Sequence, residues 1–194
     1  INEAEHAGAF GAALVSGGLP LAEITFRTPA AEHAIRSLAE RGDMLVGAGT
    51  VLTTEQADRA IDAGASFIVA PGTNPRVVEH CLDRNAPIIP GVATPTDIEL
   101  AMSLGLSTVK FFPAENLGGT SMLKALAGTY PNVRFLPTGG ITPEKLPEYL
   151  ALPSVLACGG SWLAPREALA AGDFGKIRKL IEQAVKILAN VPAK

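Results

Sequence analysis

Two charged side chains stand inside segments that are otherwise apolar, and their chemistry suggests a reaction at a carbonyl group. Lys110 lies in the run TVKFFP at 108–113, and Glu23 lies in the run PLAEITF at 20–26. Burial of a lysine removes the hydration of its ammonium form, which favours the neutral amine, a nucleophile toward carbonyl carbon. Lys110 is therefore a candidate Schiff-base nucleophile and Glu23 a candidate base. An ion-paired or phosphate-binding lysine is the alternative.

The alternation of side chains along a strand places Glu23 with two further polar residues. Glu23, Thr25 and Arg27 share one face of the predicted strand, whereas the residues between them are apolar. A buried charge is costly unless it is paired or used in chemistry. We therefore expect this face to serve a site at the C-terminal end of the strand, where barrel enzymes carry their chemistry. The alternative is an internal ion pair or exposure at the rim.

Two glycine-rich turns follow the last two predicted strands. The first is Thr138-Gly139-Gly140 and the second is Gly159-Gly160-Ser161. Such turns after strands 7 and 8 of a parallel barrel present backbone N–H groups and a helix N-terminus to a phosphate group. The sequence thus predicts a phosphate site, and the alternative is that the glycines only satisfy tight turns.

Short apolar runs that end in Gly or Pro predict the strands that would position these groups. Their starts lie 20 to 26 residues apart, and the seven runs are 20–26, 45–49, 67–71, 87–91, 108–113, 134–139 and 155–160. Helical segments lie between them and begin at cap-like residues. The predicted caps are Thr28-Pro29, Thr53, Asn74-Pro75, Thr94-Pro95 and Thr142-Pro143, and further helices are predicted from Glu3 to Val15 and from Phe174 to Leu188.

Strands that alternate with helices at this spacing predict an α/β fold with a parallel sheet. Equal unit lengths and the lack of a GxGxxG at the first helix favour a (β/α)₈ TIM barrel over an open doubly wound sheet. We interpret residues 1–194 as one domain, and only seven strands can be counted in it. We therefore expect the first strand of the barrel to be missing from the N-terminus. Either a segment before Ile1 supplies that strand, or an unpaired seam remains between 20–26 and 155–160.

The composition excludes several classes of function. The 194 residues carry a net charge of −3 without a run of Lys or Arg, which argues against nucleic acid or an anionic membrane as partner. No apolar stretch reaches the length of a membrane span. Cys81 and Cys158 are far apart and are interpreted as core thiols, and no His, Asp or Glu grouping has metal-ligand spacing. We expect a cytoplasmic protein without a metal.

Seven motifs together resemble the bacterial 2-keto-3-deoxy-6-phosphogluconate (KDPG) aldolases, which also act as 4-hydroxy-2-oxoglutarate aldolases. They cover nearly the whole chain in order and are EITFRTP (23–29), GAGTVLT (47–53), FIVAPG (67–72), IIPGVATP (88–95), VKFFPAE (109–115), FLPTGGI (135–141) and GGSWL (159–163). The resemblance implies a class I lyase on a (β/α)₈ barrel, usually a homotrimer. It also implies cleavage of the phosphorylated keto acid of the Entner–Doudoroff route to pyruvate and glyceraldehyde 3-phosphate.

The resemblance implies a role for each matching residue. It places the Schiff-base lysine at Lys110, so that no cofactor is needed beyond the covalent imine, and the general acid/base at Glu23. The remaining positions would bind substrate: Arg27 and Thr50 its carboxylate, Pro71 and Phe112 the pyruvyl group, and Thr138, Gly139, Gly140, Gly160 and Ser161 its far end and phosphate. The family's first strand, of the IPVIVI type, has no counterpart in this sequence.

Two other functions stay open from the sequence. A phosphate-binding barrel isomerase or synthase could use the same glycine turns without an imine. A non-catalytic trimeric scaffold or assembly subunit is the second alternative. The preference between KDPG and 4-hydroxy-2-oxoglutarate also stays open.

Overall fold

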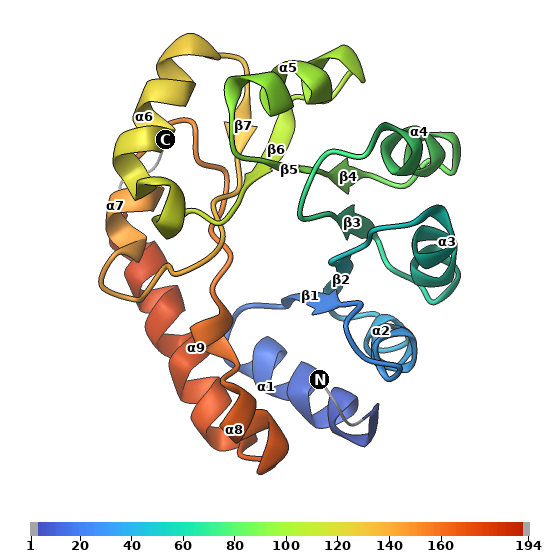
Figure 1. Ribbon diagram of the computed structural model, residues 1–194. Coiled ribbons are helices and arrows are strands. Elements are labelled where there is room, and N and C mark those ends of the chain that lie inside the picture. The colour runs from blue at the N-terminus through green and yellow to red at the C-terminus, as the bar shows by residue number, and fades with distance from the viewer. Residues whose placement is uncertain (1–3, 192–194) are drawn as a thin grey trace.

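The computed structural model describes residues 4–191, in which strands and helices alternate around an arc (Figure 1). The strands are β1 (Leu21–Thr25), β2 (Leu45–Gly49), β3 (Phe67–Val69), β4 (Ile88–Ile89), β5 (Gly91–Val92), β6 (Thr108–Phe111) and β7 (Arg134–Phe135). The α-helices are α1 (Ala7–Ser16), α2 (Ala31–Ala39), α3 (Thr54–Asp62), α4 (Pro75–Asp83), α5 (Pro95–Ser103), α6 (Gly119–Thr129), α7 (Leu146–Leu150), α8 (Arg166–Ala170) and α9 (Phe174–Ala189). Short 3₁₀ helices are η1 (Ala4–His6), η2 (Glu115–Leu117) and η3 (Ser161–Leu163).

All strand pairs are parallel, which confirms the predicted α/β fold. The hydrogen-bonded orders are β1-β2-β3-β4 and β5-β6-β7. Pro90 separates β4 from β5 because proline cannot donate to a ladder, yet its carbonyl accepts from Lys110 N at 2.8 Å. The two sheets therefore follow one another around the arc, and the predicted run at 87–91 is one bent strand.

The last two predicted strands are much shorter than expected. β7 ends at Phe135, although Leu136 N and Thr138 N still donate to Val109 O and Phe111 O of β6. The segment 155–160 is aligned with 134–138 only through the isolated bridges Phe135 to Val155 and Thr138 to Gly159. Pro137 has no N–H to donate to the segment 155–160, although its carbonyl accepts from Gly159 N at 2.9 Å, and the consecutive glycines at 159 and 160 have low strand propensity. The predicted strand at 155–160 is therefore wrong as a regular strand, although its parallel alignment with 134–138 is retained.

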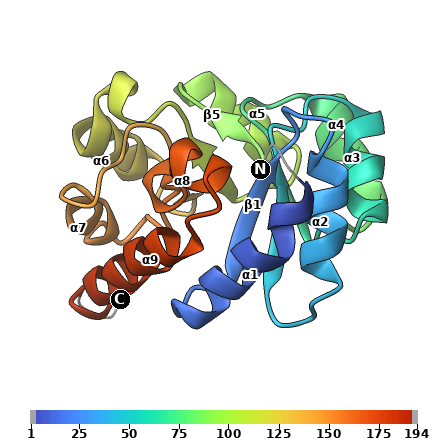
Figure 2. The same cartoon turned by 90° about the horizontal axis from the view of Figure 1, so that it is seen from below.

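The arc does not close in the part of the chain that the structure describes. No backbone pairing joins β1 to the segment 155–160 there, so the structure shows no closed barrel (Figure 1). Helices α1 and α9 pack against each other at the open side (Figures 1 and 2). Their contact is close, because a Cβ on Gly17 would stand 2.7 Å from Ile181 Cγ2.

Three of the five predicted helix caps are confirmed. The hydroxyl of Thr53, the amide oxygen of Asn74 and the hydroxyl of Thr94 each accept a hydrogen bond from a backbone N–H in the first turn of α3, α4 and α5. Asp97 returns the bond to Thr94 N, which completes a capping box.

The caps expected at Thr28 and Thr142 are wrong. Each residue instead opens a hydrogen-bonded turn, with its carbonyl accepting from Ala31 N at 3.2 Å and from Lys145 N at 3.1 Å, respectively. Helices α2 and α7 therefore begin later than expected, and neither has a side-chain cap. The terminal helices agree with prediction, since α1 ends at Ser16 and α9 runs from Phe174 to Ala189; the expected start at Glu3 lies outside the described residues.

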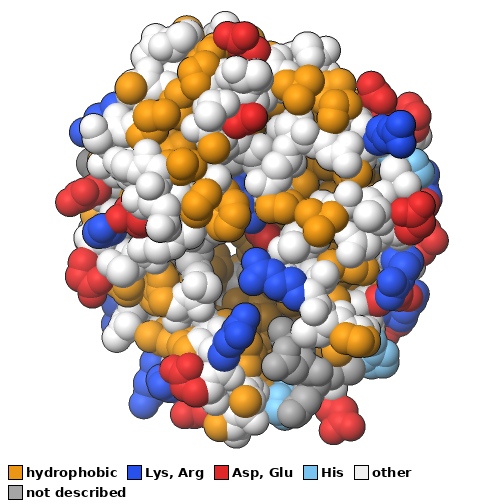
Figure 3. Space-filling view, viewed as in Figure 1, with side chains coloured by type: hydrophobic (Ala, Val, Ile, Leu, Met, Phe, Trp, Pro, Cys, Tyr) orange, Lys and Arg blue, Asp and Glu red, His pale blue; other side chains and the backbone are white. Residues whose placement is uncertain are grey.

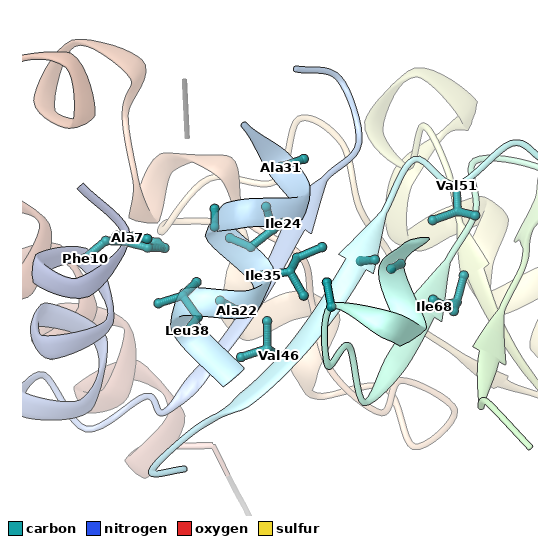
Figure 4. Close-up of a cluster of buried hydrophobic side chains, with 14 of the residues drawn as sticks. Ala7, Phe10, Ala22, Ile24, Ala31, Ile35, Leu38, Val46, Val51 and Ile68 are labelled. Carbon is teal, nitrogen blue, oxygen red and sulfur yellow. The ribbon is translucent and has the colours of Figure 1, made fainter. Parts of the chain in front are cut away.

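Two apolar clusters support the arc. The first joins α1 and α2 to β1–β3, with Ile24, Ile35 and Val46 among its members (Figure 4). The second joins β5–β7 to α5–α7 and contains Phe111 and Phe135, both fully buried. Each cluster holds one group of strands in place, so the residues of β1 and β6 that face the interior of the arc are held by well-packed strands. Among the described residues, no helix is both long and apolar enough to span a bilayer.

Candidate active site

Lys110 and Glu23 meet inside the arc. Lys110 is the only charged residue that is buried within 4–191, with 6% of its surface exposed. Its Nζ lies 3.6 Å from Glu23 Oε1 and 5.2 Å from the centre of the Phe112 ring. The Nζ–Oε1 distance exceeds that of a hydrogen bond, so a third group can interact with both atoms. The predicted nucleophile and base are thus brought together by β6 and β1.

Glycines on β2 make room for this pair. Glu23 stands opposite Gly47 in the parallel register, and Gly49 follows two residues later on the same face. A Cβ on Gly49 would lie 1.9 Å from Glu23 Oε1, and one on Gly47 would lie 2.2 Å from the Phe67 ring. The carboxylate therefore occupies the space above Gly49 that a side chain would need.

Arg27 and Thr50 are neighbours at the C-terminal ends of β1 and β2. Arg27 Nε donates to Thr50 Oγ1 at 3.4 Å, and Arg27 is exposed. Thr50 has a φ of 56°, a left-handed conformation that is unfavourable for a β-branched residue. This conformation directs the Thr50 hydroxyl toward Arg27. The two residues predicted to bind a carboxylate are therefore adjacent, and Arg27 has the parity of Glu23.

Phe112 lies beside Lys110, and Pro71 lies next to Gly91, the residue that pairs with Lys110. Gly91 pairs with Lys110 in the register of β5 and β6, and a Cβ on Gly91 would lie 2.1 Å from Pro71 O. Phe112 follows Lys110 by two residues and joins Pro113 by a cis peptide bond. Next to Pro71 is a shallow recess lined by Val51, Leu52 and residues 70–74. Viewed as in Figure 1, the surface is hollowed near its centre, where acidic and basic side chains are both visible (Figure 3).

The two glycine turns lie side by side. Thr138 bridges to Gly159, whose Cβ position would be 2.5 Å from Thr138 Oγ1. Gly139 and Gly140 have φ values of 103° and 77°, which only glycine adopts readily. A Cβ on Gly160 would lie 2.6 Å from the Trp162 indole nitrogen.

The expected helix N-terminus is present only at the second turn, as a short 3₁₀ helix, and is absent at the first. Ser161 begins the three-residue 3₁₀ helix η3, and α7 begins only at Leu146, after a further turn. Backbone N–H groups of the turns, rather than an α-helix end, are therefore what this part of the chain offers to an anion.

A polar network next to the first glycine turn was not predicted from the sequence. Glu115 accepts hydrogen bonds from Tyr149 Oη at 2.6 Å and from Lys145 Nζ. The Lys145 ammonium first, and the Tyr149 hydroxyl second, lower the pKa of the Glu115 carboxyl. Burial and the bond to Glu115 raise the pKa of Tyr149. The i,i+4 spacing of Lys145 and Tyr149 after Thr142-Pro143 is the signal that could have revealed one side of this network.

Two of the histidines contact residues outside the Lys110–Glu23 pair, and His6 packs edge-on against the Phe174 ring. His80 Nε2 is 2.9 Å from Asp58 Oδ1 between α4 and α3. Cys81 is buried, as predicted for a core thiol, whereas Cys158 is partly buried and packs against the edge of the second apolar cluster. Within the described part of the chain, no group of three or more His, Cys, Asp or Glu side chains could hold a metal ion.

Comparison with known proteins agrees with this geometry. Residues 1–180 match the family described as "Aldolase: KDPG and KHG aldolase". A protein of Treponema pallidum (strain Nichols) named 2-dehydro-3-deoxy-phosphogluconate aldolase is 53% identical over 189 residues, covering 97% of this chain and 90% of that protein.

Two solved structures have nearly the same fold. The KDPG aldolase of Zymomonas mobilis ZM4 with 3-phosphoglycerate superposes with a TM-score of 0.91 at 44% identity, covering 95% of this chain and 87% of that one. The KDPG aldolase of Legionella pneumophila, with pyruvate captured at low pH as a covalent carbinolamine, superposes with a TM-score of 0.92 at 39% identity. The match covers 95% of this chain and 90% of that one. The chain belongs to the KDPG and KHG aldolase family.

Proposed function

We propose that this protein is a class I aldolase that cleaves KDPG to pyruvate and glyceraldehyde 3-phosphate. The observation that carries the proposal is the buried Lys110 amine 3.6 Å from the Glu23 carboxylate. The covalent carbinolamine with pyruvate in the Legionella pneumophila relative supports an imine mechanism. Cleavage of 4-hydroxy-2-oxoglutarate to pyruvate and glyoxylate is part of the proposal, supported by the joint name of the family.

The reaction begins at the C2 ketone. The neutral amine of Lys110 adds to C2, and loss of water leaves a protonated imine. Glu23 takes the proton of the C4 hydroxyl, the C3–C4 bond breaks, and its electron pair moves into the imine to give an enamine. C4 leaves as the aldehyde carbon of glyceraldehyde 3-phosphate. Protonation of the enamine at C3 and hydrolysis of the imine release pyruvate and restore the amine. The imine is the electron sink, so the proposal includes no separate cofactor.

The ends of the substrate are assigned to the two polar groups on either side of Lys110. Arg27 can donate two parallel N–H bonds to the keto-acid carboxylate, and Thr50 adds one hydrogen bond. Pro71 and Phe112 enclose the pyruvyl carbons. The phosphate is assigned to the backbone and side chains of Thr138, Gly139, Gly140, Gly160 and Ser161. The 3-phosphoglycerate in the Zymomonas mobilis relative supports a phosphorylated ligand.

Assembly and location complete the proposal. We propose a cytoplasmic homotrimer and a (β/α)₈ barrel architecture. The parallel order of the strands and the fold shared with the solved aldolases support the barrel. Light scattering on the purified protein measures the oligomeric state directly.

The test is release of pyruvate from KDPG and from 4-hydroxy-2-oxoglutarate in a coupled assay. Lys110→Ala is expected to lower kcat at least about 10³-fold, because the imine cannot form, and Glu23→Gln about 10²-fold or more. Lys124→Ala, on the exposed side of α6, is the matched control and keeps full activity. Full activity of Lys110→Ala would exclude the mechanism and favour a phosphate-binding isomerase or synthase. A protein that releases no pyruvate from either acid would favour the scaffold.

A further inference from the structure

Three side chains tie helix α7 to the segment that follows β6. Glu115 begins η2, five residues after Lys110, and its two carboxylate oxygens accept from Tyr149 and Lys145. Lys145 immediately precedes α7, and Tyr149 lies within it. The network therefore connects the chain beyond the proposed nucleophile to the chain beyond the first glycine turn.

The glycine turn rests directly on Glu115. Glu115 N donates to Gly139 O at 3.1 Å, and Ala114 N donates to Thr138 O at 2.8 Å. A Cβ on Gly140 would lie 2.8 Å from Glu115 Cβ. The position of Glu115 thus sets the position of the Gly139-Gly140 backbone, which carries the N–H groups assigned to the phosphate.

Tyr149 fixes the carboxylate in place. Its side chain is 1% exposed, and its hydroxyl donates to Glu115. A buried hydroxyl that loses its partner is unfavourable, so Glu115 cannot turn away without cost. Tyr149 thereby restrains both Glu115 and the turn that packs on it.

Lys145 compensates the charge of the carboxylate. Two negative groups at short range repel each other strongly where solvent is partly excluded. The side chain of Glu115 is 21% exposed and adjoins the turn assigned to a phosphate dianion, whereas that of Lys145 is 50% exposed. Neutralisation by Lys145 therefore reduces the repulsion that an arriving phosphate would meet.

We propose that Glu115, held by Tyr149 and neutralised by Lys145, is a positioning residue that sets the affinity of the site for the phosphorylated end of the substrate. This inference rests on the proposed function, because it assigns the phosphate to the Gly139-Gly140 turn. None of the three residues is placed in contact with the reacting atoms.

Steady-state kinetics on KDPG and on its non-phosphorylated analogue, 2-keto-3-deoxygluconate, test the inference. Tyr149→Phe removes the restraint and Lys145→Met removes the compensating charge. Each is expected to raise KM for KDPG about tenfold, the effect of one lost hydrogen bond to a charged group. KM for the non-phosphorylated acid is expected to change less than twofold. The rate of C3 proton exchange in pyruvate, which requires Lys110 but no phosphate, is also expected to change less than twofold.

A double variant separates charge from geometry. In Lys145→Met/Glu115→Gln a neutral amide replaces the carboxylate and its oxygen still accepts from Tyr149, so KM for KDPG is expected to return to within about threefold of wild type. The matched controls are Tyr130→Phe, which removes a second Tyr–Glu hydrogen bond of 2.9 Å between α5 and the end of α6, and Glu99→Gln, which removes the charge of its acceptor. The controls are expected to keep both KM values unchanged.

Two results would overturn the inference. One is an unchanged ratio of the two KM values in Tyr149→Phe and Lys145→Met, with thermal unfolding confirming that the variants are folded. The other is an equal loss of activity toward both substrates together with an equal loss of the proton-exchange rate, which would indicate a general structural role. Failure of the wild type to exchange pyruvate protons would instead contradict the proposed function, and the inference would fail with it.

Discussion

Substitution of Gly49 by alanine probes the placement of the proposed base with one methyl group. The added Cβ would lie 1.9 Å from Glu23 Oε1, 2.6 Å from Cδ and 2.7 Å from Cγ. Gly49 ends strand β2 and does not have a positive φ, so alanine suits its backbone. The one group that must yield is the end of the Glu23 side chain.

The size of the effect follows from the shift that is required. Ordinary van der Waals contact begins at 3.4 Å, so the carboxylate oxygen must move by about 1.5 Å, and its present approach to Lys110 Nζ is lost. A misplacement of about 1 Å at a catalytic group can cost about 10²-fold in rate. We therefore expect kcat for KDPG cleavage to fall about 100-fold. The free energy of unfolding is expected to change by less than about 1 kcal/mol, because only the end of a flexible side chain is displaced.

The assay compares cleavage with imine formation. Pyruvate release reports the step that needs Glu23, and borohydride trapping of pyruvate reports the amine of Lys110. Gly49→Ala is expected to lose most of its pyruvate release and to retain borohydride trapping of pyruvate. Gly128→Ala is the control, because its added Cβ would meet no atom within 4 Å apart from its chain neighbours and the backbone of its own helix. Undiminished kcat in Gly49→Ala would refute the assignment of Glu23 as the base, and unfolding of the variant would refute the packing argument.

Three further predictions concern stability and reactivity. Thr94→Ala breaks the capping box of α5 and is expected to lower the free energy of unfolding by about 1 kcal/mol in urea titration, and no loss would contradict the cap. Lys145, and then Tyr149, lower the pKa of Glu115 below its ordinary value of 4.5. The charged carboxylate therefore stabilises the fold above about pH 4.5, and this stabilisation is lost as the pH falls through the lowered pKa. Melting curves of Glu115→Gln should therefore show a shallower loss of Tm on acidification than wild type, and parallel curves would contradict this. Burial first, and the charge of Asp58 second, raise the pKa of Cys81 to about 11, so iodoacetamide at neutral pH should label it only after unfolding, and rapid native labelling would contradict the burial.

The centre of the candidate site could be predicted because it depends on strand period alone. Alternation along 20–26 placed Glu23 on the face of Thr25 and Arg27, and a lysine inside TVKFFP has few structural explanations. The structure confirms that Lys110 is buried near Glu23. Helix caps with a side-chain oxygen before a helical run were also predictable, as at Thr94.

Other features depend on tertiary structure that local patterns do not report. The prolines at 90 and 137 shorten the ladders without changing the parallel order of the strands. The left-handed conformation falls on Thr50, a β-branched residue, and not on the preceding Gly49, so the sequence does not signal it. The network of Glu115 joins residues 30 and 34 positions apart, and it forms only because α6 brings the chain back to the neighbouring strand. No local period encodes such a contact.

Reductive trapping of pyruvate is the most direct test of the central claim that Lys110 forms an imine. Wild-type protein treated with pyruvate and borohydride, then digested and mapped by mass spectrometry, is expected to carry one reduced pyruvyl adduct, on the peptide that contains Lys110. Lys110→Ala is expected to carry none, and Lys124→Ala to match wild type. Absence of an adduct in folded wild-type protein, or its presence on another lysine, would contradict the account.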